Sequence, residues 1–279
     1  MVVAEAATVR GRSASRIGRL WRAQLWRTGE VGLGRAAAFA MLGGLVITAF
    51  GLLARFAPGA LTSATRRGLE ASAESRFPSA ESSAAALALA LLWIQGPALL
   101  VLFSSMPVSN FAAALGGAEV GEGKAEYLLA WGWSPREIGL ATMLTVCTRS
   151  LLIYLCMAVA WLVSAVAVSA VVLSADLGAL PWRDSLTFTL CGGLLALWTS
   201  SVVSLSAVRW PTVSAARFGS ATGISTLGAL PGLLVLGAMT VIGGDDLRQV
   251  VVVLSGLSIV VMMAVVAWLA RGLTRSALL

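Results

Sequence analysis

The chain consists largely of long apolar stretches that are separated by short polar segments, and 58% of its 279 residues are hydrophobic. Several stretches are long enough to cross a hydrocarbon core of roughly 30 Å. In lipid, every backbone N–H and C=O must be paired within the protein, so a crossing segment is either a helix or a strand of a closed barrel. The alternating pattern of barrel strands is absent. We therefore expect an all-α polytopic membrane protein.

The hydropathy pattern predicts six transmembrane helices, at residues 36–56, 84–106, 143–173, 186–208, 218–242 and 249–270. The apolar stretch from Ile138 to Ser174 spans about 55 Å as a helix, which is too long for one perpendicular crossing, yet it leaves no loop for two. We interpret it as one span with a cytoplasmic extension, which places Arg149 near the inner headgroups. The chain then divides into a tail with an amphipathic helix (1–35) and a six-helix transmembrane domain (36–279) with a cytoplasmic insert at 107–142.

An even number of spans places both termini on one side of the membrane. We assign thirteen Lys and Arg residues to that side and six to the other. Because cytoplasmic segments carry the excess of positive charge, both termini are expected in the cytoplasm. High Ala, Gly and Arg usage suggests a GC-rich bacterial genome, so the expected location is the bacterial cytoplasmic membrane, with multiple passes.

Residues 14–27 have the pattern of an amphipathic helix. In a helical projection, apolar and basic side chains occupy opposite arcs, with Ile17, Leu20, Trp21 and Leu25 on one and Arg16, Arg19, Arg22 and Arg27 on the other. Such a helix lies in the inner headgroup region as an elbow before the first span. The alternative is a disordered basic tail that only satisfies the orientation rule.

Several function classes find little support in the composition. The chain has no histidine, the commonest general base and metal ligand. Its three cysteines lie in apolar stretches, where they indicate neither a disulfide framework nor a metal site. The arginines are spread along membrane flanks instead of forming one patch, which argues against a nucleic-acid partner. We expect no catalytic residue and no metal site.

A polar insert separates the second and third predicted spans. It carries four glutamates between positions 119 and 137, although only 12% of the chain is charged. The string Gly121-Glu122-Gly123-Lys124 superficially suggests a phosphate-binding loop. That motif needs Gly and Ser or Thr where this chain has Ala118 and Ala125. The chain is therefore not expected to hydrolyse ATP by itself.

The insert resembles the cytoplasmic loop of ABC-2 type transporter permeases. The residues that carry the resemblance are Glu126-Tyr127-Leu128-Leu129 and Trp133-Ser134-Pro135-Arg136-Glu137-Ile138. It implies a coupling helix seated in a groove of a separate ABC ATP-binding subunit, present in two copies, with ATP and Mg bound there and no cofactor in this chain. A second permease copy or paralogue would complete the transport path. Many members have re-entrant helices between spans five and six, where this chain has only Gly243–Arg248.

The expected coupling residues are the acids of the insert, its large apolar residues and its Ser-Pro turn: Glu119, Glu122, Glu126, Tyr127, Leu128, Leu129, Trp131, Ser134, Pro135, Arg136 and Glu137. The two leucines and the two aromatic residues at 127 and 131 would be hydrophobic anchors with charged groups around them. The alternative is a solvated loop whose acids only keep it out of lipid.

Candidates for a substrate path or gate are polar or helix-disturbing residues within the spans: Gln95, Pro97, Thr199, Ser200, Gly228 and Pro231. Each has a structural alternative. A proline can kink a helix and free a carbonyl for an interhelical hydrogen bond, hydroxyls can bond to their own backbone, and glycines can serve close helix packing. The predicted spans carry no acidic residue, which favours a hydrophobic or amphipathic cargo.

Together these features predict the permease subunit of an ATP-driven exporter, which would move a drug, natural product, peptide or lipid outward across the membrane. The alternative is a non-transporting membrane anchor or sensor subunit that recruits a soluble partner through the same insert. A membrane-embedded enzyme is third, because the chain offers no cluster of catalytic groups.

Overall fold

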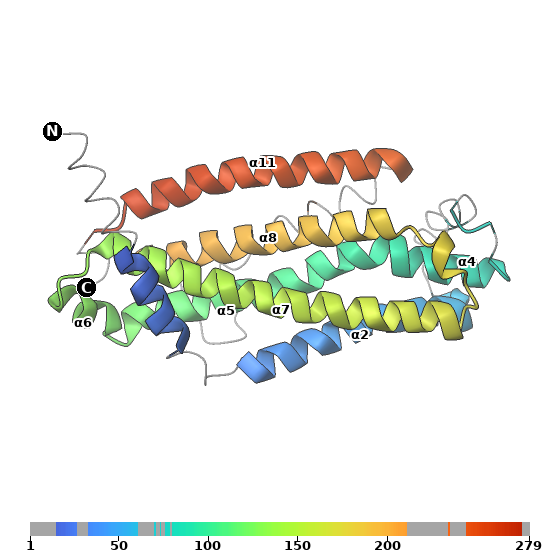
Figure 1. Cartoon of the computed structure of the whole chain (residues 1–279), viewed down its shortest axis with the longest axis horizontal. Helices are drawn as coiled ribbons and strands as arrows, with labels where there is room; N and C mark the ends of the chain where they lie inside the picture. Colours follow the sequence, from blue (N-terminus) through green and yellow to red (C-terminus); the bar gives the residue numbers. More distant parts are fainter. Residues whose placement is uncertain are drawn as a thin grey trace.

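The computed structural model of the chain is an elongated bundle of helices (Figure 1). It describes residues 15–26, 33–60, 70, 73, 76–78, 80–210, 234 and 244–274, and these residues contain no strand. Residues 15–26 form a helix, called the N-terminal helix below. The longer elements are α2 (Leu33–Phe56), α4 (Ser83–Ala90), α5 (Gly96–Gly121), α6 (Lys124–Ala130), α7 (Pro135–Val171), α8 (Trp182–Arg209) and α11 (Gly244–Arg271). Short 3₁₀ turns occur at Pro58–Ala60 and Leu177–Ala179.

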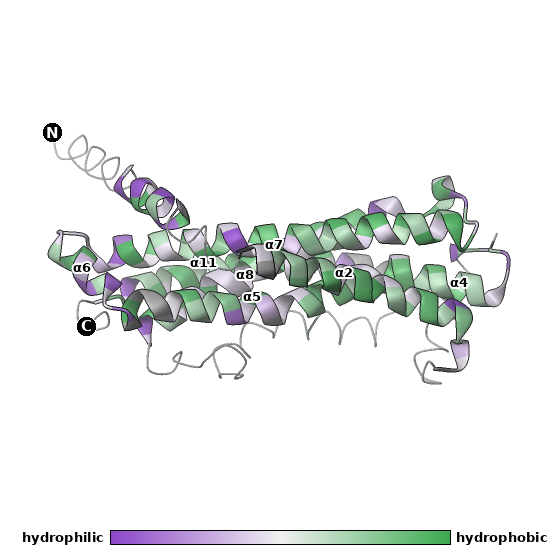
Figure 2. Cartoon of the chain, turned by 90° about the horizontal axis from the view of Figure 1, so that it is seen from below, coloured by the Kyte–Doolittle hydropathy of each residue, from purple (hydrophilic) through white to green (hydrophobic). Residues whose placement is uncertain are grey.

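Among the described residues, five helices are long and apolar enough to cross a membrane, at Ala37–Phe56, Ser83–Gly117, Pro135–Val171, Trp182–Arg209 and Val252–Arg271. The described part of the chain is all-helical, as predicted, and the length and composition of these helices support a multi-pass membrane protein. Hydrophobic residues run along the length of the bundle, while hydrophilic ones gather toward its ends and on the N-terminal helix (Figure 2). The remaining predicted span, 218–242, lies outside the described residues except for Leu234.

The second span continues further than the sequence predicts. A helical path runs from Ser83 through α5 to Gly121, so the first part of the predicted insert 107–142 is helix α5 and its last part is helix α7. The extension packs closely on α8, where a Cβ added to Gly116 would lie 2.8 Å from the carbonyl oxygen of Ser204. The connection between the two long helices is therefore only residues 122–134.

Pro97 lies just after a π-helical turn, Leu91–Gln95, that joins α4 to α5. Proline has no N–H to offer the carbonyl of the residue four positions earlier, which is Trp93. In the structure, Oγ of Ser185 on α8 donates a hydrogen bond to that carbonyl oxygen (2.8 Å). The freed acceptor thus forms an interhelical hydrogen bond, as the structural alternative for Gln95 and Pro97 predicts.

Trp93 also belongs to the larger buried hydrophobic cluster of the bundle. Its ring is 6.0 Å from that of Trp161 on α7 and 4.7 Å from that of Trp182 at the start of α8. Its indole Nε1 donates to Oγ of Ser169 on α7 (2.9 Å). One side chain therefore joins three helices by packing and by a hydrogen bond.

Helices α2 and α7 cross at a glycine. A Cβ added to Gly44 would lie 2.6 Å from the carbonyl oxygen of Met157 and 2.8 Å from the backbone N of Trp161. Four residues further along α2, the hydroxyls of Thr48 and Ser164 are hydrogen-bonded at 2.6 Å. Small residues at a crossing let two helix backbones approach closely, which is how helices associate in lipid.

We predict that Gly44→Ala lowers the free energy of unfolding by about 1–3 kcal/mol, because its methyl group would meet backbone atoms that cannot move away. The measurement is thermal or denaturant unfolding of the detergent-solubilised protein. Gly256→Ala on α11 is the matched control, since an added Cβ there has no described atom within 4 Å. The control should be neutral or stabilising by up to about 1 kcal/mol, as alanine is the better helix former. Equal effects of both substitutions would contradict the close crossing.

Candidate functional site

Five elements meet at the α6 end of the bundle. Their shared hydrophobic cluster, called the α6-end cluster below, consists of Leu20, Ala125, Ile138, Ala141, Leu205, Val208, Leu269 and Leu273. These residues come from the N-terminal helix, α6, the start of α7, the end of α8, the end of α11 and the segment that follows it. Both described ends of the chain therefore lie at this end of the molecule.

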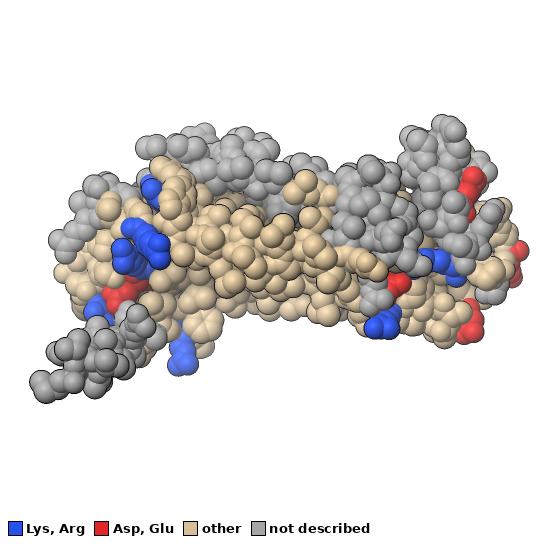
Figure 3. Space-filling view, turned by 90° about the horizontal axis from the view of Figure 1, so that it is seen from above, with Lys and Arg blue, Asp and Glu red and all other residues tan. Residues whose placement is uncertain are grey.

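Charge is concentrated at the ends of the bundle. Figure 3 shows Lys, Arg, Asp and Glu side chains toward the two ends and an uncharged surface between them. On the described elements of the α6 end, the basic residues are Arg16, Arg19, Arg22, Lys124, Arg136, Arg209 and Arg271, and the acids with described side chains are Glu122, Glu126 and Glu137. This end carries a net positive charge.

Helix α6 is bounded by a glycine in the left-handed region at each end. Gly123 precedes it with φ 70° and Gly132 follows it with φ 76°. At the C-terminal end, the N–H of Gly132 bonds to the carbonyl of Leu129 (3.1 Å) and the N–H of Trp133 bonds to that of Leu128 (3.1 Å). This pair of bonds is a Schellman motif, which ends a helix sharply. A seven-residue helix is thereby held in a defined orientation.

The predicted anchors of the insert lie on two different faces of α6. Leu128 and Leu129 are partly buried and pack, beside Ala125, against the α6-end cluster. Tyr127 and Trp131 point outward with 62% and 70% of their surface exposed, and their rings lie 5.6 Å apart. Among the large apolar side chains described between residues 120 and 138, only Tyr127 and Trp131 are exposed.

The charged residues of the insert also differ in their surroundings. Glu122 and Glu126 are exposed, and Glu122 forms an ion pair with Lys124. Arg136 is exposed on the first turn of α7. Glu119 lies in the last turns of α5, where its side chain is not described. The exposed acids thus lie on the same connection as the aromatic pair.

Ser134, Pro135 and Glu137 have a structural part in the site, because they start α7. The backbone N of Ser134 donates to Oε2 of Glu137 (2.9 Å), and the backbone N of Glu137 donates to Oγ of Ser134 (3.2 Å). This reciprocal arrangement is a capping box, with proline at the first helical position. Glu137 is only 7% exposed, so its carboxylate is held in place by the fold.

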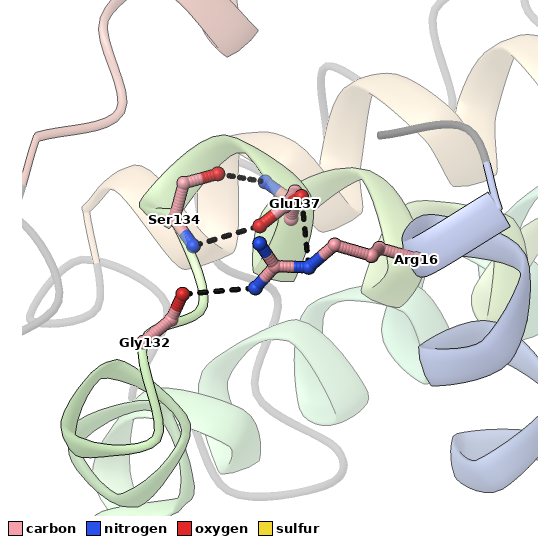
Figure 4. Close-up of polar contacts among 4 residues, drawn as sticks. All are labelled: Arg16, Gly132, Ser134 and Glu137. Atoms are coloured by element: carbon pink, nitrogen blue, oxygen red, sulfur yellow. Dashed lines mark hydrogen bonds and ion pairs between the residues drawn. The ribbon is translucent and has the colours of Figure 1, made fainter. Parts of the chain in front are cut away.

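Arg16 of the N-terminal helix joins this cap to the end of α6 (Figure 4). Its Nη2 donates to the carbonyl oxygen of Gly132 (2.9 Å), and its Nε lies 3.5 Å from Oε1 of Glu137. The guanidinium also lies over the ring of Trp133, 4.8 Å from the ring centroid. One arginine therefore fixes the turn between α6 and α7 from three directions.

The rest of the N-terminal helix is held along α7 by buried polar contacts. Gln24 donates from Nε2 to Oγ1 of Thr142 and accepts from Oγ1 of Thr145, both at 3.2 Å. Arg149, which is 3% exposed, donates from Nη2 to the carbonyl oxygen of Leu25 (3.1 Å). These contacts join the N-terminal helix to the first four turns of α7.

The proposed substrate-path residues do not gather with the insert. Thr199 and Ser200 are buried on α8, and Oγ of Ser200 donates to the carbonyl oxygen of Leu197 (3.1 Å). Thr199 borders a cavity of about 10 Å³, which is room for about one water molecule. Gly228 and Pro231 lie outside the described residues. Among the described residues, no group of three His, Cys, Asp or Glu side chains could hold a metal ion.

Two residues of the site were not singled out from the sequence. Arg16 was placed on the basic arc of an interfacial helix, although its long side chain reaches Gly132 and Glu137, more than a hundred positions away. Gly132, between two tryptophans, is the left-handed residue that ends α6. A glycine directly after a short apolar helical pattern is a signal that could have identified this helix end.

No protein-family model, characterised protein or solved structure matches the chain. Its function must be inferred from the residues and their geometry.

We predict that Arg16→Gln loosens the α6–α7 turn, because it removes the ion pair to Glu137 and weakens the contacts with Gly132 and Trp133. Hydrogen exchange of the peptide that covers residues 124–137 should become about fivefold faster, which corresponds to roughly 1 kcal/mol of local stability. Arg19→Gln, an exposed arginine of the same helix, is the control and should leave this exchange unchanged. Identical exchange in Arg16→Gln and wild type would contradict the role of Arg16.

Proposed function

We propose that this chain is the transmembrane permease subunit of an ATP-driven ABC exporter, and that α6 is the helix through which a separate ATP-binding subunit acts on it. The observation that carries the proposal is the outward-facing pair of Tyr127 and Trp131 on a short helix with a defined start and end. The resemblance of the insert to ABC-2 type permease loops supports the same conclusion.

An exposed aromatic pair at the polar end of a membrane protein needs a physical reason. Tyr and Trp are enriched among the residues that dominate binding energy at protein interfaces, where charged groups surround them. Tyr127 and Trp131 have Glu122 and Glu126 on the same connection. Because Leu128 and Leu129 pack inward, α6 would keep its place in the bundle while its outer face enters a groove of the partner.

The energy source in this proposal is ATP bound with Mg in the partner subunit. Acidic residues of the five described spans occur only near helix ends, at Glu137 and Asp184. Ion coupling through carboxylates in the membrane interior therefore has no support from these helices. The chain also lacks the residues of a phosphate-binding loop, so two copies of a separate ATPase would supply the work.

Helix α7 offers a path for that work. Residues 131–134 separate it from α6, and it continues without a break for 37 residues, about 55 Å. Arg16, Gln24 and Arg149 hold the N-terminal helix on its first turns. In our proposal, a displacement of α6 tilts α7 together with this elbow helix, which moves the bundle between two packings.

Topology in the proposal follows from the helix directions. The ends of α8 and α11 share the α6-end cluster, so these two helices run parallel. We propose that the predicted span 218–242 crosses the membrane once between them, which gives six spans. In our proposal the positively charged α6 end faces the cytoplasm of a bacterial cell, in keeping with the excess of basic residues in cytoplasmic segments, and both termini lie on that side. A second permease copy or paralogue and a hydrophobic or amphipathic cargo complete the proposal.

We predict that replacing Tyr127 and Trp131 together by alanine weakens binding of the ATP-binding subunit at least about 100-fold, because each residue would be an interface anchor worth about 2 kcal/mol. The partner is identified by a photo-crosslinking amino acid at position 127 of the full-length chain in its native membrane. Affinity and ATPase activity are then measured with both proteins in proteoliposomes.

The control is Trp26→Ala, which removes another exposed tryptophan from the same end of the molecule but outside the insert. It should bind the partner with wild-type affinity, and all variants should insert into the membrane equally well. Wild-type affinity of the double variant would contradict coupling through α6. Transport by the single chain without ATP or partner would overturn the exporter, and partner binding without ATP-dependent transport would favour the anchor or sensor subunit.

A further inference from the structure

Arg209, the last residue of α8, contacts two tryptophan rings. Its guanidinium carbon is 4.8 Å from the ring centroid of Trp210 and 4.5 Å from that of Trp268 on α11. The two rings are 6.3 Å apart. Because an arginine over an aromatic face is held by the ring quadrupole, the position of this cation is set by α8 and α11 together.

The charge of Arg209 has no counterion in the described part of the chain. Its Nη1 is buried and has no hydrogen-bond partner there. The same atom lies against the end of α11, since a Cβ added to Gly272 would be 2.5 Å from it. The aromatic rings satisfy the cation electrostatically but accept no ordinary hydrogen bond, so the remaining N–H groups of the fork are available to an anion.

The length of α8 places Arg209 at the level of lipid headgroups. The helix has 28 residues and is therefore about 42 Å long, close to the ~40–45 Å of a bilayer with its headgroup regions. Tryptophans mark both of its limits, Trp182 at the first residue and Trp210 directly after the last. Such aromatic residues are typical of the two membrane–water interfaces.

A second cation lies beside this group. Arg271 is exposed in the last turn of α11 and follows Trp268 by three residues, so both side chains project from the same face of the helix. Trp268 and Trp210 are themselves 57% and 40% exposed. Two arginines and two accessible indole rings are therefore presented together at one edge of the positively charged α6 end.

We propose that Arg209, Trp210, Trp268 and Arg271, called the Arg209 site, bind the phosphate of an anionic phospholipid headgroup. The arginines supply charge and hydrogen bonds to the phosphate, and the tryptophans pack against the glycerol and upper acyl region. A zwitterionic lipid carries its own ammonium group and is attracted less. The site is separate from α6 and does not depend on the proposed exporter function.

The test uses the full-length protein in phosphatidylcholine nanodiscs that contain increasing amounts of a photoreactive phosphatidylglycerol. Peptides that contain Trp210 and Trp268 should be labelled, and Arg209→Gln should require about fivefold more of the anionic probe for half-maximal labelling. The matched control is Arg183→Gln, an exposed arginine at the opposite end of the same helix. This control should leave the labelling of both peptides unchanged.

Three results would overturn the proposal. The first is that Arg209→Gln is labelled as strongly as wild type, and the second is that a photoreactive phosphatidylcholine labels the protein equally well. The third is that millimolar inorganic phosphate displaces the anionic probe, which would indicate a site for a free anion. If Arg209→Gln does not fold, as judged by gel filtration and circular dichroism, Arg271→Gln tests the same site. Its side chain is exposed, and it should reduce labelling severalfold, while unchanged labelling would equally reject the site.

Discussion

Polar atoms inside this bundle must find partners in the protein itself, because lipid offers no hydrogen bonds. The freed carbonyl of Trp93 is bonded by Ser185, the indole of Trp93 is bonded by Ser169, and the hydroxyl of Tyr154 donates to the carbonyl of Thr189 (2.6 Å). Each bond joins two different helices through residues that lie 35 to 92 positions apart. Apolar contacts alone would favour many alternative pairings of helix faces about equally. These hydrogen bonds therefore help decide which helix faces pack together.

The same requirement organises the α6 end. Arg149 on α7 would be costly in an apolar environment without an acceptor, and the carbonyl of Leu25 is its acceptor. Gln24 satisfies Thr142 and Thr145 from the same N-terminal helix. Helix α7 is thus the common partner of the elements around it. It also connects the short helix that presents the aromatic pair to the opposite end of the bundle.

The sequence predicted only part of the candidate site. Features that depend on residues close together in the chain could be recognised, and features that depend on contacts between distant helices could not. The Ser-Pro turn before the third span was recognised, but Ser134, Pro135 and Glu137 were assigned to partner coupling, whereas Ser134 and Glu137 cap the start of α7 over three residues. The sequence did not show that the four anchor residues lie on two faces of α6, with Tyr127 and Trp131 outward and Leu128 and Leu129 inward. This arrangement depends on which side of α6 faces the bundle. The contact of Arg16 with the α6–α7 turn was not recognised for the same reason.

The sequence by itself determined that the chain forms apolar helices, and it contains the local signals that start α7 at Ser134 and end α6 at Gly132, because hydropathy, backbone pairing, capping and left-handed glycines act over a few residues. Only the tertiary structure decided that α5 continues to Gly121 along α8, that Arg16 holds the α6–α7 turn, and that Arg209 contacts both Trp210 and Trp268. These features require residues that lie tens to more than a hundred positions apart to meet. Helix packing supplies that proximity, and no local pattern encodes it.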